Sequence, residues 1–313
     1  MADPDAVICL GEALIDRLGP LGGDPACDQP VDDRLGGAPA NVACGLARLG
    51  TAVSFVGRVG GDAIGADFQH LFSQRGVDTS TLQLDPSHPT RIVLVRRSGD
   101  GERQFQGFAG DQGDGVADQA LQAVALPSTA RGLLVGTIPL ASAQSAQALL
   151  DAVAQARSQG IALALDVNWR PTFWDSAADP VAGPTQAAQS AIRPLLEQAA
   201  LIKLAREEAL WFFAGDDPRV ISSGLPQRPD VVATDGAAPV RWCIGGTSGT
   251  QPALSPPQVV DTTGAGDAFT AGLLHRWSAP VAERLRFAAA CGALVCAGAA
   301  IWRWGAPIPG FCR

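Results

Sequence analysis

Lysine is nearly missing from this chain: among its 313 residues, Lys203 is the only one. The 23 Lys and Arg residues are outnumbered by 31 Asp and Glu residues, which gives a formal net charge of −8 at pH 7. Nucleic acids and anionic membranes bind clusters of Lys and Arg, so we expect neither as a partner. A phosphate group bound by this chain must be held by arginine, backbone amides or a metal ion.

Cysteine pairs and a secretion signal are also missing. The seven cysteines form no C-x-x-C pair, and no histidines stand at metal-ligand spacing. Asp3 and Asp5 occupy the region where a signal peptide carries basic residues. The apolar stretch 287–301 is short for a bilayer span and rich in Ala and Gly, which indicates a buried helix. We therefore expect a cytoplasmic protein.

The common nucleotide-binding and hydrolase motifs are missing as well. A P-loop needs Ser or Thr directly after its lysine, and here Leu204 follows the only lysine. No G-x-G-x-x-G follows a predicted strand, and neither G-x-S-x-G nor H-E-x-x-H occurs. Phosphate binding must therefore use another design.

What is present is an alternation of short apolar runs with longer segments of helical spacing. It predicts an α/β fold that is doubly wound, with a mostly parallel central sheet flanked by helices, in a single domain over 1–313. Strands are predicted at 6–10, 53–57, 131–136, 161–166, 200–204 and 230–234. Helices are predicted at 39–49, 64–76, 117–125, 142–159, 186–198, 206–213, 267–277 and 281–299, with Gly50, Gly76, Gly160 and Gly215 at C-terminal caps.

Two segments, about 12–35 and 90–108, break this alternation. The second contains two apolar runs around Ser98-Gly99-Asp100-Gly101, which is typical of a β-hairpin. We expect the two segments to form a small separate sheet.

The nonamer DTTGAGDAF, residues 261–269, carries the strongest chemical signal. Gly264, Ala265 and Gly266 precede a helical segment, so backbone N–H groups and the helix dipole can meet an anion there. Asp267 lies in the first turn, where we expect the dipole to keep its carboxylate ionised. Such a carboxylate can accept the proton of a hydroxyl that attacks a phosphoryl group. An isolated Asp here would be a simple helix cap, but the whole nonamer favours catalysis.

Polar residues after other predicted elements suit a sugar. The loop GGAPAN, residues 36–41, opens a predicted helix, and Asn41 can both donate to and accept from neighbouring hydroxyls. Asp16 follows the first strand, where a carboxylate can accept two hydrogen bonds from adjacent hydroxyls. Asn168 and Arg170 in DVNWR follow another strand, at the sheet edge where α/β folds bind ligands. Each pattern alone is also typical of an ordinary helix start or loop.

With these motifs the chain resembles the ribokinase-like (PfkB) carbohydrate kinases. RLGGAPANVACGLARLGTAVSFVGRVGGDAIG and DTTGAGDAFTAGLL are similar to the two family signatures, and GEALID, GGAPAN and DVNWR are most similar to fructokinases. The resemblance covers nearly the whole chain. It implies ATP-dependent phosphorylation of a sugar hydroxyl, most of all fructose to fructose 6-phosphate, under a small β-sheet lid.

The resemblance also implies residue roles. Asp267 is the implied base, the backbone of Gly264, Ala265 and Gly266 the anion hole, and Arg170 faces the transferred phosphate. The implied sugar contacts are Asp16, Gly36, Gly37, Asn41, Phe105 and Asn168. The implied ATP contacts are Lys203, Glu208, Thr234, Gly236, Gly264 and Gly266. Glu208 would act on Mg²⁺ through water, and activation by K⁺ is compatible with residues 261–263.

Some positions depart from the family pattern. Ala205 replaces the Asn of N-x-x-E, Pro239 replaces the second Gly of T-x-G-x-x-G, and Ala289 stands where an adenine-pocket Asn is common. After Phe105 the chain lacks an arginine that fructokinases often carry. The nucleotide donor and the exact sugar therefore stay open.

Two alternatives follow from these departures. One is a kinase for another acceptor, such as ribose, 2-keto-3-deoxygluconate or a nucleoside. The other is a non-catalytic family member that binds sugar or nucleotide as a regulatory or structural protein. In either case the small sheet offers exposed edges through which a homodimer could form.

Overall fold

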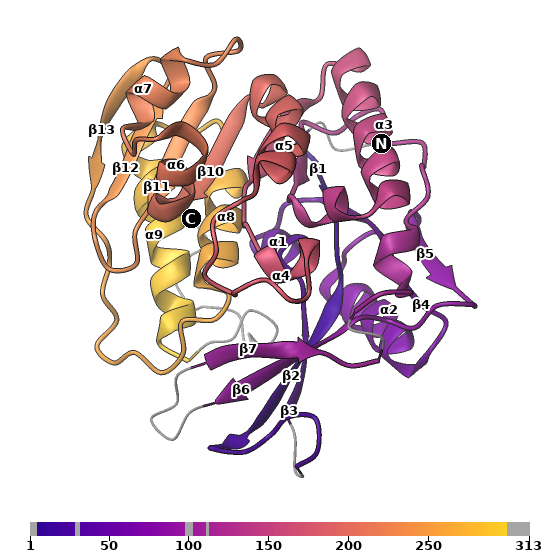
Figure 1. Cartoon of the computed structure of the whole chain (residues 1–313). Coiled ribbons are helices and arrows are strands. Elements are labelled where there is room, and N and C mark those ends of the chain that lie inside the picture. The colour runs from indigo at the N-terminus through magenta and orange to yellow at the C-terminus, as the bar shows by residue number, and fades with distance from the viewer. Residues whose placement is uncertain (1–4, 29–31, 98–102, 111–112, 299–313) are drawn as a thin grey trace.

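The central layer of the structure, a computed structural model that describes residues 5–28, 32–97, 103–110 and 113–298, is a nine-stranded sheet (Figure 1). Its strand order is β13-β12-β11-β10-β9-β8-β1-β4-β5, and only the pairs that include β12 are antiparallel. Its strands are β1 (Val7–Leu10), β4 (Val53–Gly60), β5 (Leu82–Asp85), β8 (Gly132–Val135), β9 (Ala162–Asp166), β10 (Leu201–Ala205), β11 (Asp230–Thr234), β12 (Val240–Ile244) and β13 (Thr247–Gln251). The predicted mostly parallel sheet is confirmed.

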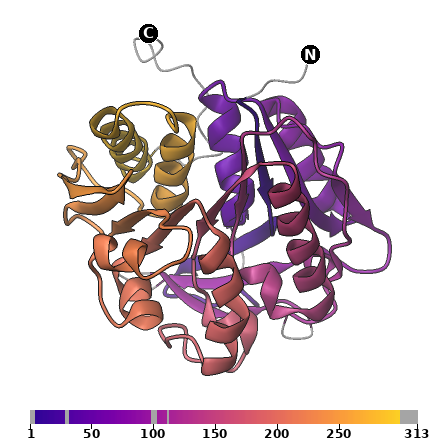
Figure 2. The same ribbon diagram turned by 90° about the horizontal axis from the view of Figure 1, so that it is seen from above.

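Helices cover both faces of this sheet, as Figure 2 shows, and this is why its inner strands are apolar throughout. One face packs against α1 (Ala38–Arg48), α2 (Ala63–Arg75), α8 (Ala265–His275) and α9 (Val281–Cys296). The other face packs against α3 (Ala143–Ser158), α5 (Gln186–Gln198), α6 (Arg206–Phe213) and α7 (Pro218–Ser223). The doubly wound architecture is therefore confirmed.

A second sheet of four strands lies beside one end of the central sheet, at the bottom of Figure 1. Its order is β3-β2-β6-β7, with β2 (Leu14–Leu21), β3 (Asp32–Gly36), β6 (Ile92–Arg97) and β7 (Arg103–Phe108). These strands come from the two segments that were predicted to form it. The predicted hairpin turn at 98–101 lies outside the described residues, but β6 and β7 do pair antiparallel. Since β2 follows β1 after only three residues, the small sheet sits at the carboxyl edge of the central one.

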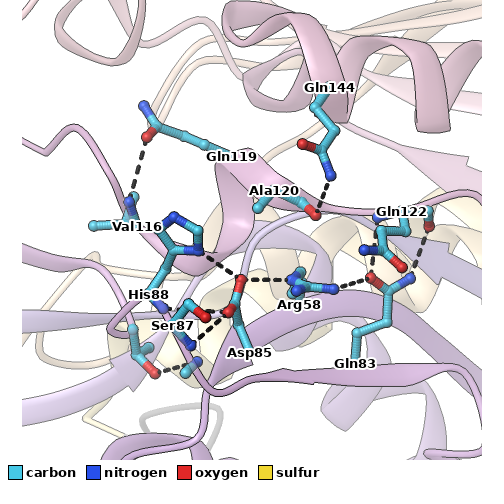
Figure 3. A network of polar contacts seen from close by, with 12 residues as sticks. Arg58, Gln83, Asp85, Ser87, His88, Val116, Gln119, Ala120, Gln122 and Gln144 are labelled. Atoms are coloured by element: carbon cyan, nitrogen blue, oxygen red, sulfur yellow. Dashed lines mark hydrogen bonds and ion pairs between the residues drawn. The ribbon is translucent and has the colours of Figure 1, made fainter.

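Two local predictions were wrong. The segment 117–125 forms only a 3₁₀ helix, η1 (Ala117–Ala120), before it becomes extended. There the Gln122 N–H donates to Gln83 Oε1 (3.0 Å), and Gln83 Nε2 donates to the Gln122 carbonyl (2.7 Å), so a side chain of β5 replaces helical hydrogen bonds (Figure 3). At the end of α6, Ala214 rather than Gly215 takes the left-handed conformation, with φ 53°.

Shorter elements were not predicted at all: β5, β12, β13, η2 (Ile138–Ala141), α4 (Pro171–Trp174) and α7. The last helix ends at Cys296, and position 299 of its predicted span lies outside the described residues.

A buried carboxylate fixes the point where the chain leaves the central sheet for β6 (Figure 3). Asp85, which is 1% exposed, accepts from Arg58 Nε at 2.8 Å and from the Ser87 N–H at 2.8 Å. His88 Nδ1 lies 2.9 Å from the same carboxylate. Burial would raise the pKa of Asp85, but hydrogen bonds from Arg58, Ser87 and His88 hold it well below its ordinary value.

Replacing Asp85 with Ala should lower the free energy of unfolding by about 3–5 kcal/mol at pH 7, because Arg58 would stay buried without its partner. The lowered pKa means that this stability is present above about pH 4 and is lost as the pH falls further. Urea unfolding measures the change. Asp151→Ala, on the exposed face of α3, is the control and should cost less than about 0.5 kcal/mol. Equal losses in the two variants would contradict the role of Asp85.

Candidate functional site

A cavity of about 490 Å³ lies where the carboxyl ends of β9 and β10 and the start of α8 face the small sheet. Most of the predicted site residues lie in its wall: Asp16, Gly37, Asn41, Phe105, Asn168, Arg170, Lys203, Glu208, Gly264, Gly266 and Asp267. Residues that are far apart in the sequence thus meet at the sheet edge that the fold predicts for a ligand.

The start of α8 forms one end of the cavity. Gly264 precedes the helix in a left-handed conformation, with φ 77°, which glycine adopts without a Cβ penalty. Thr263 is held by its N–H, which donates to Asp261 Oδ1 at 3.0 Å. The N-terminal N–H groups of α8 therefore face the cavity from a backbone without bulky side chains, as an anion site requires.

Asp267 in the first turn of α8 meets Asn41 in the first turn of α1. Asn41 Nδ2 donates to Asp267 Oδ2 at 2.8 Å. One helical turn further along each helix, Gly45 lies against Ala271, so closely that a Cβ on Gly45 would come within 2.8 Å of the Ala271 methyl. The small residue lets the helices approach, and the approach brings the amide to the carboxylate.

Burial has the largest influence on the pKa of Asp267. Removal from water and the nearby Asp166 carboxylate raise the pKa, which comes to about 6 instead of 3.8 when all influences act together. The hydrogen bond from Asn41 and the charges of Lys203 and Arg170 act in the opposite direction. The carboxylate is still mostly ionised at pH 7, and it is more basic than an exposed aspartate.

Lys203, the only lysine, stands beside the anion site. Its Nζ donates to Asp166 Oδ1 at 3.1 Å, while Thr270 Oγ1 of α8 donates to Asp166 Oδ2 at 2.9 Å. A Cβ on Gly266 would lie 3.4 Å from Nζ, so the ammonium adjoins the first turn of α8. Burial disfavours the charge, but Asp166 and Glu208 raise the pKa of Lys203 above its ordinary value. The cavity therefore contains a fixed positive charge.

Glu208 connects the ends of β9 and β10, close to the ammonium of Lys203. Its Oε1 accepts the Trp169 N–H at 2.6 Å, and its Oε2 accepts the Ala205 N–H at 2.7 Å. Asn168, directly before Trp169, has a left-handed φ of 40°, which Asn tolerates better than most residues. Arg170 is exposed, and its Nη1 donates to the Trp169 carbonyl at 2.9 Å.

The opposite end of the cavity is polar on one side and apolar on the other. Asp16 lies against the glycine loop, since a Cβ on Gly36 would come within 2.8 Å of Asp16 Oδ2. Gly37, with φ 98°, lets its loop approach the Glu12 carbonyl, which a Cβ would meet at 2.4 Å. The apolar side is formed by Leu14, Val93, Val95, Phe105, Ile138 and Phe173. A sugar presents hydroxyl groups and C–H faces that match such a pair of walls.

Some predicted residues lie outside the wall. Gly36 and Ala265 are sequence neighbours of wall residues. Thr234 is the last residue of β11 and pairs with Ala205, which does line the cavity, and Gly236 follows two residues later. Their role in ATP binding stays a prediction. A larger cavity of about 590 Å³ lies between α5, α6 and α7, and it contains none of the predicted residues.

Comparison with known proteins identifies the family of the chain. The pattern of the pfkB family carbohydrate kinases matches residues 5–299. The chain belongs to the pfkB family of carbohydrate kinases. It is therefore a carbohydrate kinase, and it is similar to a probable chloroplastic fructokinase-6 of Arabidopsis thaliana, with 33% identity over 92% of this chain and 76% of the relative. It is also 35% identical to a fructokinase of Klebsiella pneumoniae, over 91% of both chains.

Solved structures extend the comparison to bound ligands. A fructokinase from Vibrio cholerae O395, solved with fructose, ADP and calcium ion, superposes with a TM-score of 0.76 at 27% identity, over 94% of both chains. This likeness confirms the predicted ribokinase-like fold of this carbohydrate kinase. In the described part of the chain, no helix is long and apolar enough to cross a membrane.

Sequence reasoning missed Glu12 in this kinase. Glu12 is 2% exposed and lines the cavity; its Oε1 accepts the Ala38 N–H at 3.0 Å. Its Oε2 is buried and has no hydrogen-bond partner among the residues that the structure describes. Burial, together with the charges of Asp118 and Asp267, raises the pKa of Glu12 from 4.5 to about 8, although hydrogen bonds from two backbone N–H groups act in the opposite direction. GEALID gave no signal that this carboxyl would be enclosed.

Replacing Glu12 with Gln should make the protein more resistant to alkaline pH. The raised pKa means that the stability from protonated Glu12 is complete below about pH 4.5 and is lost as the pH rises to about 8, on the order of 4 kcal/mol in all. Gln keeps an acceptor for the Ala38 N–H and does not titrate. The difference in Tm between Glu12→Gln and wild type, measured from pH 5 to 9, should therefore grow with pH. A constant difference would contradict a titrating Glu12.

Proposed function

We propose that this carbohydrate kinase transfers the γ-phosphoryl group of ATP to the 6-hydroxyl of fructose, with Asp267 as the general base. The proposal is supported by one observation: the GGAPAN loop and the start of α8 contact each other at the carboxylate of Asp267. Asp267 belongs to the anion site at the start of α8, and Asn41, which binds it, belongs to the GGAPAN loop on the sugar side. A hydroxyl placed between them would lie next to both a base and a phosphate.

The residues divide the work of phosphoryl transfer. Asp16, Asn41 and the backbone at Gly36 and Gly37 orient the sugar, and the apolar wall excludes water around it. Asp267 accepts the proton as the sugar oxygen bonds to the γ-phosphorus. The bond from that phosphorus to the β–γ bridging oxygen breaks, and ADP leaves with the electron pair.

Charge that develops during the transfer is met by several groups. Gly264, Gly266 and Arg170 line the cavity together with Asp267, and the ammonium of Lys203 adjoins Gly266. Such fixed dipoles and charges stabilise the transferring group without reorganising. We therefore assign the anion hole to this part of the wall.

Mg²⁺ fits this site as a companion of ATP rather than as a resident ion. Both oxygens of Glu208 already accept backbone N–H groups, and within the described ranges no three His, Cys, Asp or Glu residues cluster as metal ligands. Glu208 would therefore hold the ion through water, and the ion would neutralise charge on the phosphate oxygens. Activation by K⁺, a cytoplasmic location and a homodimer through the small sheet stay predictions.

Fructose is favoured among acceptors by the relatives, which are named as fructokinases. The experiment is an ADP-release assay with MgATP and fructose, ribose, glucose, mannose, 2-keto-3-deoxygluconate or adenosine. Turnover selective for fructose is expected. Selectivity for another acceptor would keep the chemistry and replace the substrate, and no turnover with any of them would support the non-catalytic alternative.

Asp267→Asn should lower kcat by roughly 10³-fold, because a neutral amide cannot accept the proton, while calorimetric affinities for sugar and ATP stay nearly unchanged. In the wild type, kcat/KM for the sugar should rise with pH through about 6, where the Asp267 carboxyl ionises. The control is Asp151→Asn on the exposed face of α3. Unchanged turnover in Asp267→Asn would exclude it as the base.

A further inference from the structure

Arg91, which directly precedes β6, is a buried arginine whose guanidinium contacts both polar groups and aromatic rings. It is 4% exposed, and it makes a bidentate pair with Asp118 of η1, from Nε at 2.8 Å and from Nη2 at 3.0 Å. Its Nη1 donates to the Gly113 carbonyl at 3.0 Å. Asp118 and Gly113 belong to the segment that returns from β7 to the central domain. Arg91 therefore joins the points where the chain leaves for the small sheet and returns from it.

The guanidinium also lies between two aromatic rings from different parts of the fold. Its Cζ is 5.2 Å from the ring centre of Phe108, at the end of β7, and 4.9 Å from that of Phe173, in α4. The two rings meet edge to face, with centres 5.1 Å apart. Phe105 continues this contact along β7, again at 5.1 Å. Cation–π and edge-to-face contacts of this kind prefer a defined relative position.

Phe173 links this cluster to the substrate cavity. The apolar cluster on the small sheet contains Leu14, Val93, Val95, Phe105 and Phe108, and in the described structure Phe173 is its one member from outside that sheet. Phe173 lines the cavity, and its N–H donates to the carbonyl of Arg170 at 3.1 Å. The position of Phe173 thus sets both the apolar wall and the start of α4, where Arg170 faces the phosphate side.

We propose that Arg91 is a positioning residue for the acceptor sugar: it holds the small sheet in register with the 168–174 loop, so that Phe105, Phe173 and Arg170 form one wall. Arg91 does not line the cavity that contains Asp267, and it acts on that cavity through Phe173. The backbone supports the same role, since the Arg91 carbonyl accepts the N–H of Ile15, in β2 next to Asp16. The inference rests on the proposed function for the identity of the sugar and on the structure alone for the geometry.

The alternative is that the ion pair between Arg91 and Asp118 stabilises the fold and has no effect on sugar binding. The chain offers a matched control for it in Arg284 of α9. Arg284 is 2% exposed, donates to Asp230 at 3.3 Å and to the Leu273 carbonyl at 3.1 Å, and lies 5.6 Å from the ring centre of Trp277. It has the same kinds of partner as Arg91 but packs between α9 and β11, outside the small sheet.

The experiment compares Arg91→Met, Arg91→Lys and Asp118→Asn with Arg284→Met. Arg91→Met should raise KM for the sugar by roughly 10-fold or more and change KM for ATP less than about 2-fold, because misplacement affects the acceptor wall first. Arg91→Lys should keep most of the defect, since one ammonium cannot replace a bidentate, stacked guanidinium. Arg284→Met should lower Tm and leave both KM values within about 2-fold.

Hydrogen exchange provides a measurement that needs no substrate. Amides of 172–175 and of β6 and β7 should exchange faster in Arg91→Met than in Arg284→Met. Equal exchange in these segments, or a sugar KM that is unchanged in all Arg91 and Asp118 variants, would overturn the inference. Lack of wild-type turnover with every sugar would instead count against the proposed function, and the exchange comparison would still decide the role of Arg91.

Discussion

The close packing of α8 is the constraint on which the site depends. On one side Gly45 of α1 meets Ala271, and on the other Gly272 meets α9, where a Cβ would come within 2.9 Å of the Ala288 Cα and the Cys291 sulfur. Larger residues at these contacts would push the helices apart, because interiors packed at this density have no free space. The position of Asp267 relative to Asn41 is thus set by glycines one turn or more away from either residue.

The electrostatics of the cavity follow from how few basic side chains it contains. Lys203 is held by Asp166, which is itself held by Thr270, so the positive charge is fixed with respect to α8. Around it lie buried carboxyl groups whose pKa values are raised: Glu12, Glu208 and Asp267. Two cations, Lys203 and Arg170, among several acids suit a site that receives a polyanionic nucleotide together with a metal ion. Burial also gives Asp267, the proposed base, a basicity that an exposed aspartate lacks.

Much of the fold could be predicted from the sequence, because the spacing of apolar residues and the positions of the capping glycines indicate the same elements. The buried parallel strands and the long helices follow apolar runs and glycine caps, so their predicted bounds differ from the structure by at most three residues. The 117–125 segment has helical composition, but Gln83 satisfies its backbone at Gln122 from a neighbouring strand, and only the tertiary structure reveals this. Likewise Asn41 and Asp267 were predicted from motifs, whereas Glu12, Arg91 and Phe173 gain their importance from neighbours that are distant in the sequence.

The contact between Asn41 and Asp267 also has a consequence for synthesis on the ribosome, because 226 positions separate the two residues in the chain. The proposed sugar-binding residues Asp16 and Asn41 and the small sheet are translated well before α8. During translation this half lacks the proposed base Asp267, and its open face next to α1 must stay uncovered until α8 emerges. A nascent chain therefore passes through a long stage in which it can neither phosphorylate a sugar nor bury the apolar surface of α1. Chaperones that shield this surface would act during that interval.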